Sequence, residues 1–253
     1  MDSEHGDPQN HELPGATSVL AVCAHPDDES FGLGATLAAF AAAGSSTAVL
    51  CFTHGEATTL GDDISALGGV RATELSDAAA ELGVHHVELC DYQDGALAQQ
   101  PLDRLTRHVC QVAERVRADL LLVFDEGGIS GHPDHRRATE AALAFARENR
   151  LPVLAWALPE HVATTLNEEL GTGFVGRGAE NLDLKLYVHR ERQHRAITCH
   201  ASQATDNPVL WRRLELQGDL EVFRWLLAPS ERSTICSTNG PSPLSGQSDK
   251  EEG

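Results

Sequence analysis

Five short strand-like runs, most of them almost wholly apolar, recur through the first 160 residues. They are TSVLAVCA (17–24), STAVLCFT (46–53), HHVELCD (85–91), ADLLLVFD (118–125) and PVLAWAL (152–158). The segments between them space their apolar residues as helices do, over 31–44, 69–83, 101–117 and 133–149. Strands that do not alternate polar with apolar residues are typical of a parallel sheet buried on both faces. We therefore predict an α/β, Rossmann-like fold with a mostly parallel sheet flanked by helices on both faces.

The regular alternation ends near Gly171. One or two strands are expected within 173–190, a helix over 189–203 and a last edge strand over 219–227, which predicts an irregular C-terminal part with short edge strands. Both ends of the chain are polar, and such composition is typical of disorder. The predicted organisation is a disordered segment at 1–16, one domain at 17–228 and a disordered tail at 229–253.

Charge and composition limit the partners. The formal net charge of −19 argues against binding to nucleic acid or an anionic membrane, and it suits a neutral small molecule or a metal ion. No membrane span or signal peptide is predicted, because no run of eighteen apolar residues occurs and the N-terminus is acidic. Cys23, Cys51 and Cys90 lie in strand-like runs, as buried thiols of a reducing compartment do. We expect a cytoplasmic protein, as a monomer or a homo-oligomer.

Two clusters of histidine and aspartate follow predicted strands. AHPDDE (24–29) comes directly after the first run, and GHPDH (131–135) follows the run 118–125. Ligands of open parallel sheets bind beyond the carboxyl ends of the strands, so both clusters are expected at one edge of the sheet.

The residue types in these clusters suit a catalytic metal site. Pro133 is expected to open a helix, which places His132 and His135 near its N-terminus with neutral rings. Together with His25 and Asp28 they provide imidazoles and a carboxylate around an open position, as catalytic zinc sites do. Zinc lowers the pKa of bound water from about 16 to roughly 7. The adjacent Asp27 would then be free to act as a general base.

These two motifs resemble those of the LmbE-like (PIG-L) N-acetylglucosaminyl deacetylases, and the resemblance runs from about Ser18 to Gln203. It implies a zinc-dependent hydrolase that removes an N-acetyl group from a GlcNAc-containing amino sugar by metal-hydroxide attack. It also implies His25, Asp28 and His135 as ligands of one Zn²⁺ per chain, for which Fe²⁺ or Co²⁺ could substitute.

The remaining roles follow from the same resemblance. Asp27 is implied as the general base, His132 as the group that stabilises the oxyanion or protonates the amine, and Asp134 as the residue that orients the His132 ring. Arg71 and Asp94 are implied as substrate-binding residues.

Two further segments resemble family motifs. CFTHGE resembles a loop that points Gly55 and Glu56 toward the site, and CHASQ places His200 either near the site or in a packing role at a helix end. One position departs from some thiol-sugar deacetylases of the family, which carry a tyrosine where this chain has Ser130. That departure leaves the pathway open.

Simpler interpretations of the same residues remain. The two clusters could form a polar network at a sheet edge, Arg71 could pair with Glu74 on the surface, and Asp94 before Gly95 could serve a turn. The stretch 61–69 is a candidate lid.

Other functions also stay open. One is an amidase that acts on another acyl-amino-sugar or thiol-sugar conjugate with the same site. A metal-dependent phosphoesterase is disfavoured because the ligands suffice for only one metal. A non-catalytic binding protein is the last alternative.

Overall fold

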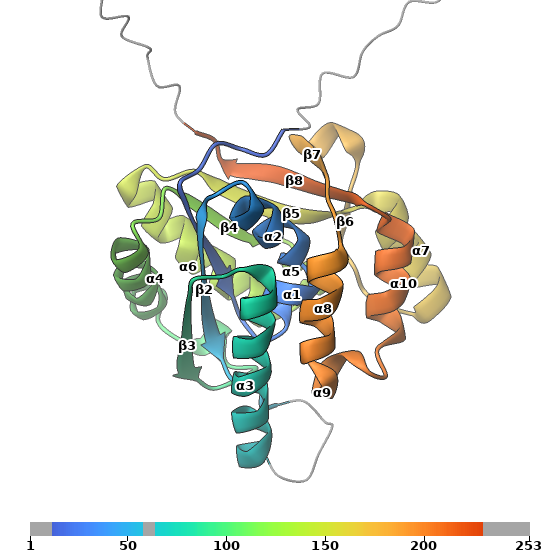
Figure 1. Ribbon diagram of the computed structural model, residues 1–253, viewed down its shortest axis with the longest axis horizontal. Coiled ribbons are helices and arrows are strands. Elements are labelled where there is room, and N and C mark those ends of the chain that lie inside the picture. Colours follow the sequence, from blue (N-terminus) through green and yellow to red (C-terminus); the bar gives the residue numbers. More distant parts are fainter. Residues whose placement is uncertain (1–11, 58–63, 230–253) are drawn as a thin grey trace, which may run out of the picture.

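The computed structural model describes residues 12–57 and 64–229. Within them one sheet has the strand order β3-β2-β1-β4-β5-β8-β7, with β6 paired to β5 (Figure 1). The strands are β1 Ser18–Cys23, β2 Ser46–Thr53, β3 His86–Tyr92, β4 Leu120–Phe124, β5 Val153–Pro159, β6 Gly176–Arg177, β7 Leu184–Tyr187 and β8 Leu220–Leu227. Strands β1 to β6 pair in parallel, whereas β8 runs antiparallel to β5 and β7. The predicted α/β fold with a mostly parallel sheet is confirmed.

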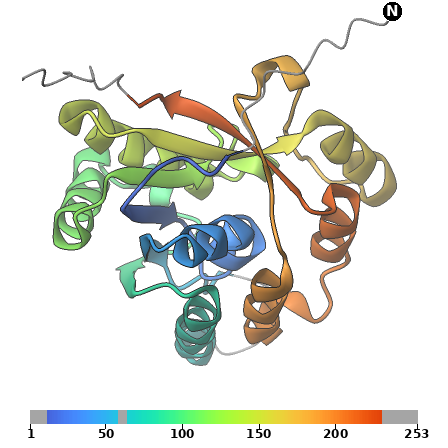
Figure 2. The same cartoon turned by 45° about the horizontal axis from the view of Figure 1, so that its top comes forward.

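Helices cover both faces of this sheet (Figure 2). They are α1 Asp28–Phe31, α2 Gly34–Ala42, α3 Ile64–Leu82, α4 Leu102–Val116, α5 Gly128–Gly131, α6 Pro133–Asn149, α7 Glu160–Leu170, α8 Glu191–Cys199, α9 Ala201–Ala204 and α10 Pro208–Gln217. Side chains of α2, α3, α7 and α8 share one apolar cluster with the sheet, and those of α4 and α6 share the other.

Strand β1 shows why these runs are apolar throughout. Val19, Ala21 and Cys23 belong to the first cluster, and Leu20 and Val22 belong to the second. Successive side chains of a strand point to opposite faces of the sheet. Because helices cover both faces here, no side chain of such a strand faces solvent. Each residue of β1 is buried.

The helix predicted over 31–44 is two helices. Helix α1 already begins at Asp28, and the chain bends at Gly32 and Leu33 before α2. A Cβ on Gly32 would lie 2.3 Å from Cε1 of Phe124, so only glycine lets α1 approach the end of β4 this closely.

The expected loop over 61–69 is helical from residue 64, since α3 begins at Ile64 rather than at Gly69. Gly68 is tolerated inside the helix and lies against His54, whose Nδ1 is 3.4 Å from the Gly68 carbonyl oxygen. The candidate lid therefore loses residues 64–69, and residues 61–63 lie outside the described part of the chain.

The C-terminal part differs most from expectation. The strand predicted at an edge is β8, which lies between β5 and β7 because both its sides pair. Helices α7 and α10 were not predicted, although Asn207 before Pro208 is a helix-start signal and its side chain accepts from the N–H of Leu210 over 2.9 Å.

Leu13 and Ala16 pack against the core, so the ordered chain begins before residue 17, while the predicted disorder of 1–11 and 230–253 lies outside the described residues. Among the helices that the structure describes, none is long and apolar enough to cross a membrane.

Candidate active site

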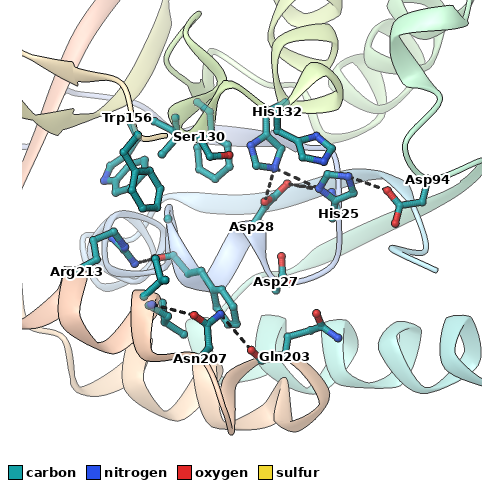
Figure 3. A pocket seen from close by; sticks show the side chains of 18 of the residues that line it. His25, Asp27, Asp28, Asp94, Ser130, His132, Trp156, Gln203, Asn207 and Arg213 are labelled. Atoms are coloured by element: carbon teal, nitrogen blue, oxygen red, sulfur yellow. Dashed lines mark hydrogen bonds and ion pairs between the residues drawn. The ribbon is translucent and has the colours of Figure 1, made fainter. Parts of the chain in front are cut away.

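A cavity of about 430 Å³ opens where β1 and β4 end (Figure 3). These strands are neighbours, with Ala21 opposite Leu122. The two His/Asp clusters, more than a hundred residues apart in sequence, therefore meet in the cavity. Nδ1 of His25 lies 3.2 Å from Nε2 of His135.

Three side chains present donor atoms with the spacing of a metal site. Besides the His25–His135 distance, Nε2 of His135 lies 3.1 Å from Oδ1 of Asp28, and Nδ1 of His25 lies 3.7 Å from Oδ2 of Asp28. Ligand atoms at the usual distances from tetrahedral zinc stand about 3.3–3.5 Å apart, so this set fits the ion. The structure also brings His132 within reach of the same two imidazoles, so a set of three histidines is geometrically available.

The other nitrogen of His25 faces two carboxylates. Its Nε2 lies 3.0 Å from Oδ1 of Asp94 and 3.6 Å from Oδ2 of Asp134, yet it makes no well-directed hydrogen bond. These carboxylates already accept backbone N–H groups of Ala57, Gly95 and Leu97. Such outer carboxylates fix the ring that a metal binds through its opposite nitrogen, and they are less suited to be ligands themselves.

The carboxylates of the cluster favour a positive charge on or beside its imidazoles. Burial opposes the charged form of His25, but the nearby carboxylates of Asp134, Asp94 and Asp28 outweigh it and raise its pKa to about 10. Burial likewise opposes protonation of His135, and the carboxylate of Asp28 outweighs it and raises the pKa. At His135 the carboxylate of Asp28 thus acts against the helix N-terminus, which favours a neutral ring. Protons and a metal ion would compete for this place.

Asp27 has the environment of a general base. Burial raises its pKa, the charge of Arg71 lowers it and Asp28 raises it again, which leaves the pKa at about 7. Its backbone φ of 113° lies in the left-handed region, which is strained for aspartate. The strain turns the side chain of Asp27 into the cavity while Asp28, the next residue, faces the imidazoles (Figure 3).

Arg71 is not a surface residue. It is only 3% exposed, and Nη2 donates to Oδ2 of Asp27 over 2.8 Å and to the carbonyl of Pro26, while Nη1 donates to the carbonyl of Gly55. Glu74 bonds to Ser202 instead, with the Ser202 hydroxyl 2.6 Å away. The alternative of an Arg71–Glu74 surface pair is therefore wrong.

Asp94 lies at the cavity in contact with His25, and its backbone N–H donates to Oε1 of Glu56 over 3.0 Å. The loop that contains Gly55 and Glu56 thus reaches the site, as the resemblance implied. Glu56 acts there on the backbone of Asp94.

His132 and Ser130 line the same cavity. The N–H of Asp134, rather than its carboxylate, orients the His132 ring by donating to Nδ1 over 3.2 Å. Burial, with the charges of His25 and His135, lowers the pKa of His132, which is the direction that favours a neutral ring. Ser130 follows Ile129, which adopts a φ of 61°, a strained value for a β-branched residue.

Sequence reasoning assigned no role to a buried pair behind Asp27. Oε2 of Glu29 accepts the Asp27 N–H over 2.9 Å, and its Oε1 lies 2.7 Å from Nε2 of His200. Both side chains are completely buried. Glu29 belongs to the motif AHPDDE, so its place in that motif was the available signal.

Comparison with known proteins places the chain among deacetylases. The profile of the family described as PIG-L, GlcNAc-PI de-N-acetylase, matches residues 20–146, half of the chain. A relative from Nakamurella multipartita, named 1D-myo-inositol 2-acetamido-2-deoxy-alpha-D-glucopyranoside deacetylase, is 34% identical over 57% of this chain and 58% of its own length. The chain thus spans less than two thirds of that relative. A relative of the same name from Corynebacterium glutamicum is 28% identical over 84% of this chain and 86% of its own.

A solved structure shows the same fold. The N,N'-diacetylchitobiose deacetylase from Pyrococcus horikoshii superposes with a TM-score of 0.63 at 22% identity, over 85% of this chain and 87% of that one.

Proposed function

This chain belongs to the PIG-L (GlcNAc-PI de-N-acetylase) family, and we propose that it is a zinc-dependent hydrolase that removes the N-acetyl group of a GlcNAc-containing amino sugar. The products would be acetate and the free amine. One observation carries the proposal: His25, Asp28 and His135 present donor atoms 3.1–3.7 Å apart, beside a half-buried Asp27 whose pKa is about 7.

In this proposal Nδ1 of His25, a carboxylate oxygen of Asp28 and Nε2 of His135 hold one Zn²⁺, with Fe²⁺ or Co²⁺ as substitutes. When bound, the ion supplies Lewis acidity that polarises the acetyl carbonyl and activates water near neutral pH. Asp28 is preferred to His132 as the third ligand because it lies closer to His135 and its charge offsets that of the ion.

Asp27 acts as the base in the proposed reaction. It takes a proton from the water that adds to the acetyl carbon, and it returns that proton to the nitrogen as the C–N bond breaks. A base works best when its pKa lies near the operating pH, which the value of about 7 satisfies. Arg71 holds Asp27 in place through its 2.8 Å bond.

His132 is the proposed partner of the developing oxyanion. Its Nδ1 accepts the N–H of Asp134, so the neutral ring carries its proton on Nε2 and can donate it. Because the hydroxyl of Ser130 is short, His132 would provide most of the stabilisation of the oxyanion. Asp94, which already fixes His25, and Arg71 remain the proposed contacts to the sugar.

The rival functions are less well supported. A two-metal phosphoesterase holds two ions about 3.5–4 Å apart, usually with a bridging carboxylate, whereas the two candidate groups within the described residues have only His25 in common. An amidase that acts on another acyl group would use the same site, and the acid released distinguishes it.

The test is release of acetate and amine from a panel of N-acetylglucosaminides by the zinc-loaded protein. Treatment with chelator should abolish turnover, and added Zn²⁺ should restore it. Turnover that survives complete metal removal, or no turnover on any member of the panel, would overturn the proposal. Release of a longer acid from N-acyl analogues but not of acetate would favour the amidase.

A further inference from the structure

The cavity has two halves of different character. His25 and Asp94 lie on one side, and Trp156 and Arg213 lie on the other (Figure 3). The second half is walled by Phe31, Phe124, Trp156 and Phe174. The whole chain has only seven Phe, three Trp and two Tyr residues, so four in one wall is a marked concentration.

Arg213 is the charged residue of this aromatic half. It is 4% exposed, and its guanidinium carbon lies 5.2 Å from the centre of the Trp156 ring. Nη1 donates to Oε1 of Gln217 over 2.5 Å, and Nη2 donates to the carbonyl of Phe31. A guanidinium has five N–H donors, so these two bonds leave donors to spare.

Arg213 differs from the other buried arginines of the described chain. Arg71 pairs with Asp27 at 2.8 Å, and Arg190 pairs with Glu221 at 2.5 Å. No carboxylate among the described residues lies within ion-pair distance of Arg213. Burial lowers its pKa to about 10, with Glu221 opposing that shift and Arg190 adding to it.

A buried charge without a counter-ion is unfavourable unless something compensates it. The structure offers such a place, since the cavity reaches Arg213. We propose that the aromatic half receives the aglycone of the substrate, and that this aglycone is an apolar body bearing a carboxylate or phosphate that pairs with Arg213. The inference rests on the proposed deacetylase function, which places the acetamido group at His25 and Asp27.

The same geometry says where the anion cannot bind. Asp27, Asp28 and Asp94 gather in the polar half and would repel it there. The acidic composition pointed to a neutral ligand, but the local charge at Arg213 favours a negative group at the far end.

The first experiment compares aryl N-acetylglucosaminides that differ only in the para substituent: carboxylate, phosphate or neutral carboxamide. Wild-type protein should show kcat/KM about tenfold or more higher for an anionic aryl glycoside than for the carboxamide, the effect of one charged hydrogen bond. Whichever of the carboxylate and the phosphate gives the higher kcat/KM is the negative group that the natural aglycone is expected to carry. Equal or lower values for both anions, with acetate released from all, would overturn this inference and leave the proposed function standing.

Binding gives a readout that does not need turnover. Calorimetry with the deacetylated carboxyphenyl and carbamoylphenyl glucosaminides should show the same preference. A preference in binding without acetate release would overturn the proposed function alone.

The variant Arg213→Gln should bring the anion-to-carboxamide ratio to about one. Arg212→Gln is the matched control, because Arg212 is its neighbour on α10 but pairs with Glu169 and Glu215 on the surface. That control should keep the wild-type ratio. An anion-to-carboxamide ratio that persists in Arg213→Gln would refute the pairing of the anion with Arg213. If that variant does not fold, the comparison of the anionic and carboxamide substrates with the wild-type protein tests the proposal.

Discussion

Nη2 of Arg71 donates to Oδ2 of Asp27 over 2.8 Å, and the same guanidinium binds the carbonyls of Pro26 and Gly55. One cation therefore ties the proposed base to the two loops that follow β1 and β2. Because this charge lowers the pKa of Asp27 against the effect of burial, it helps to set the pH at which the base is ionised.

Replacing Arg71 with methionine should raise the pKa of Asp27. The acidic limb of the kcat/KM profile of the metal-loaded protein should then move to higher pH, because Asp27 works only when deprotonated. Activity at pH 7 should fall about tenfold with loss of this charge-assisted bond. Arg71→Lys, which keeps the charge, should move the limb less. A limb that stays in place in both variants would show that Arg71 does not act through Asp27.

Asp27 and His135 should separate turnover from metal binding. Asp27→Asn should keep the metal and lose about 100- to 10,000-fold in kcat, because it removes only the base. His135→Ala should lose the metal itself, since a ligand is gone. Metal content after gel filtration, measured beside kcat, checks both, and equal metal loss in the two variants would contradict the division of roles.

His200 should contribute to stability through Glu29. His200→Ala leaves the Glu29 carboxylate buried without its 2.7 Å partner, and should lower the free energy of unfolding by about 3 kcal/mol. The control is His194→Ala on the exposed side of α8, which should change it by less than about 0.5 kcal/mol. Urea denaturation measures the free energy of unfolding of both variants. Similar losses in the two would show that the Glu29–His200 pair contributes no more to stability than an exposed histidine does.

Asp125 should make stability depend on pH. Burial raises its pKa, but Arg177 and Arg224 outweigh burial and hold the pKa below its ordinary value of 3.8. A depressed folded-state pKa adds stability above that value, and this stability disappears as the pH falls through the lower one.

Asp125→Asn should therefore lower the free energy of unfolding by about 3 kcal/mol at pH 7. The difference from wild type should narrow as the pH falls below 3.8, where the carboxyl of the unfolded wild-type chain takes up a proton, and it should be smallest below the lower folded-state pKa. Denaturation curves across this range provide the measurement. A difference that stays constant would assign the loss to packing rather than to charge.

Local patterns predicted the half of the fold that ends with β5. Strand runs such as SVLAVC and the start of α6 at Pro133 were predicted closely, because burial on both faces and a helix cap leave strong local signals. Places where tertiary packing decides were predicted less well. The break at Gly32 depends on Phe124, and the inner position of β8 depends on its pairing with β7.

The site residues also fall into those that local patterns predicted and those that depend on tertiary packing. The meeting of His25 with His135 followed from two strand ends, whereas the pairing of Glu29 with His200 joins residues 171 positions apart. No local pattern encodes such a contact. Arg213 likewise carries no local signal, because only the fold shows that it is buried and that its neighbour Arg212 is not.

The return of the chain through β8 and α10 has a consequence for how such proteins diversify. The family profile ends at residue 146, but Trp156, Phe174 and Arg213 come from later segments that fold back over the cavity. The proposed metal ligands and base thus lie in the stretch that the profile matches, whereas three of the proposed aglycone contacts lie in the stretch that follows. Under this proposal, substitutions in the later stretch would alter the aglycone contacts and leave the proposed ligands and base in place.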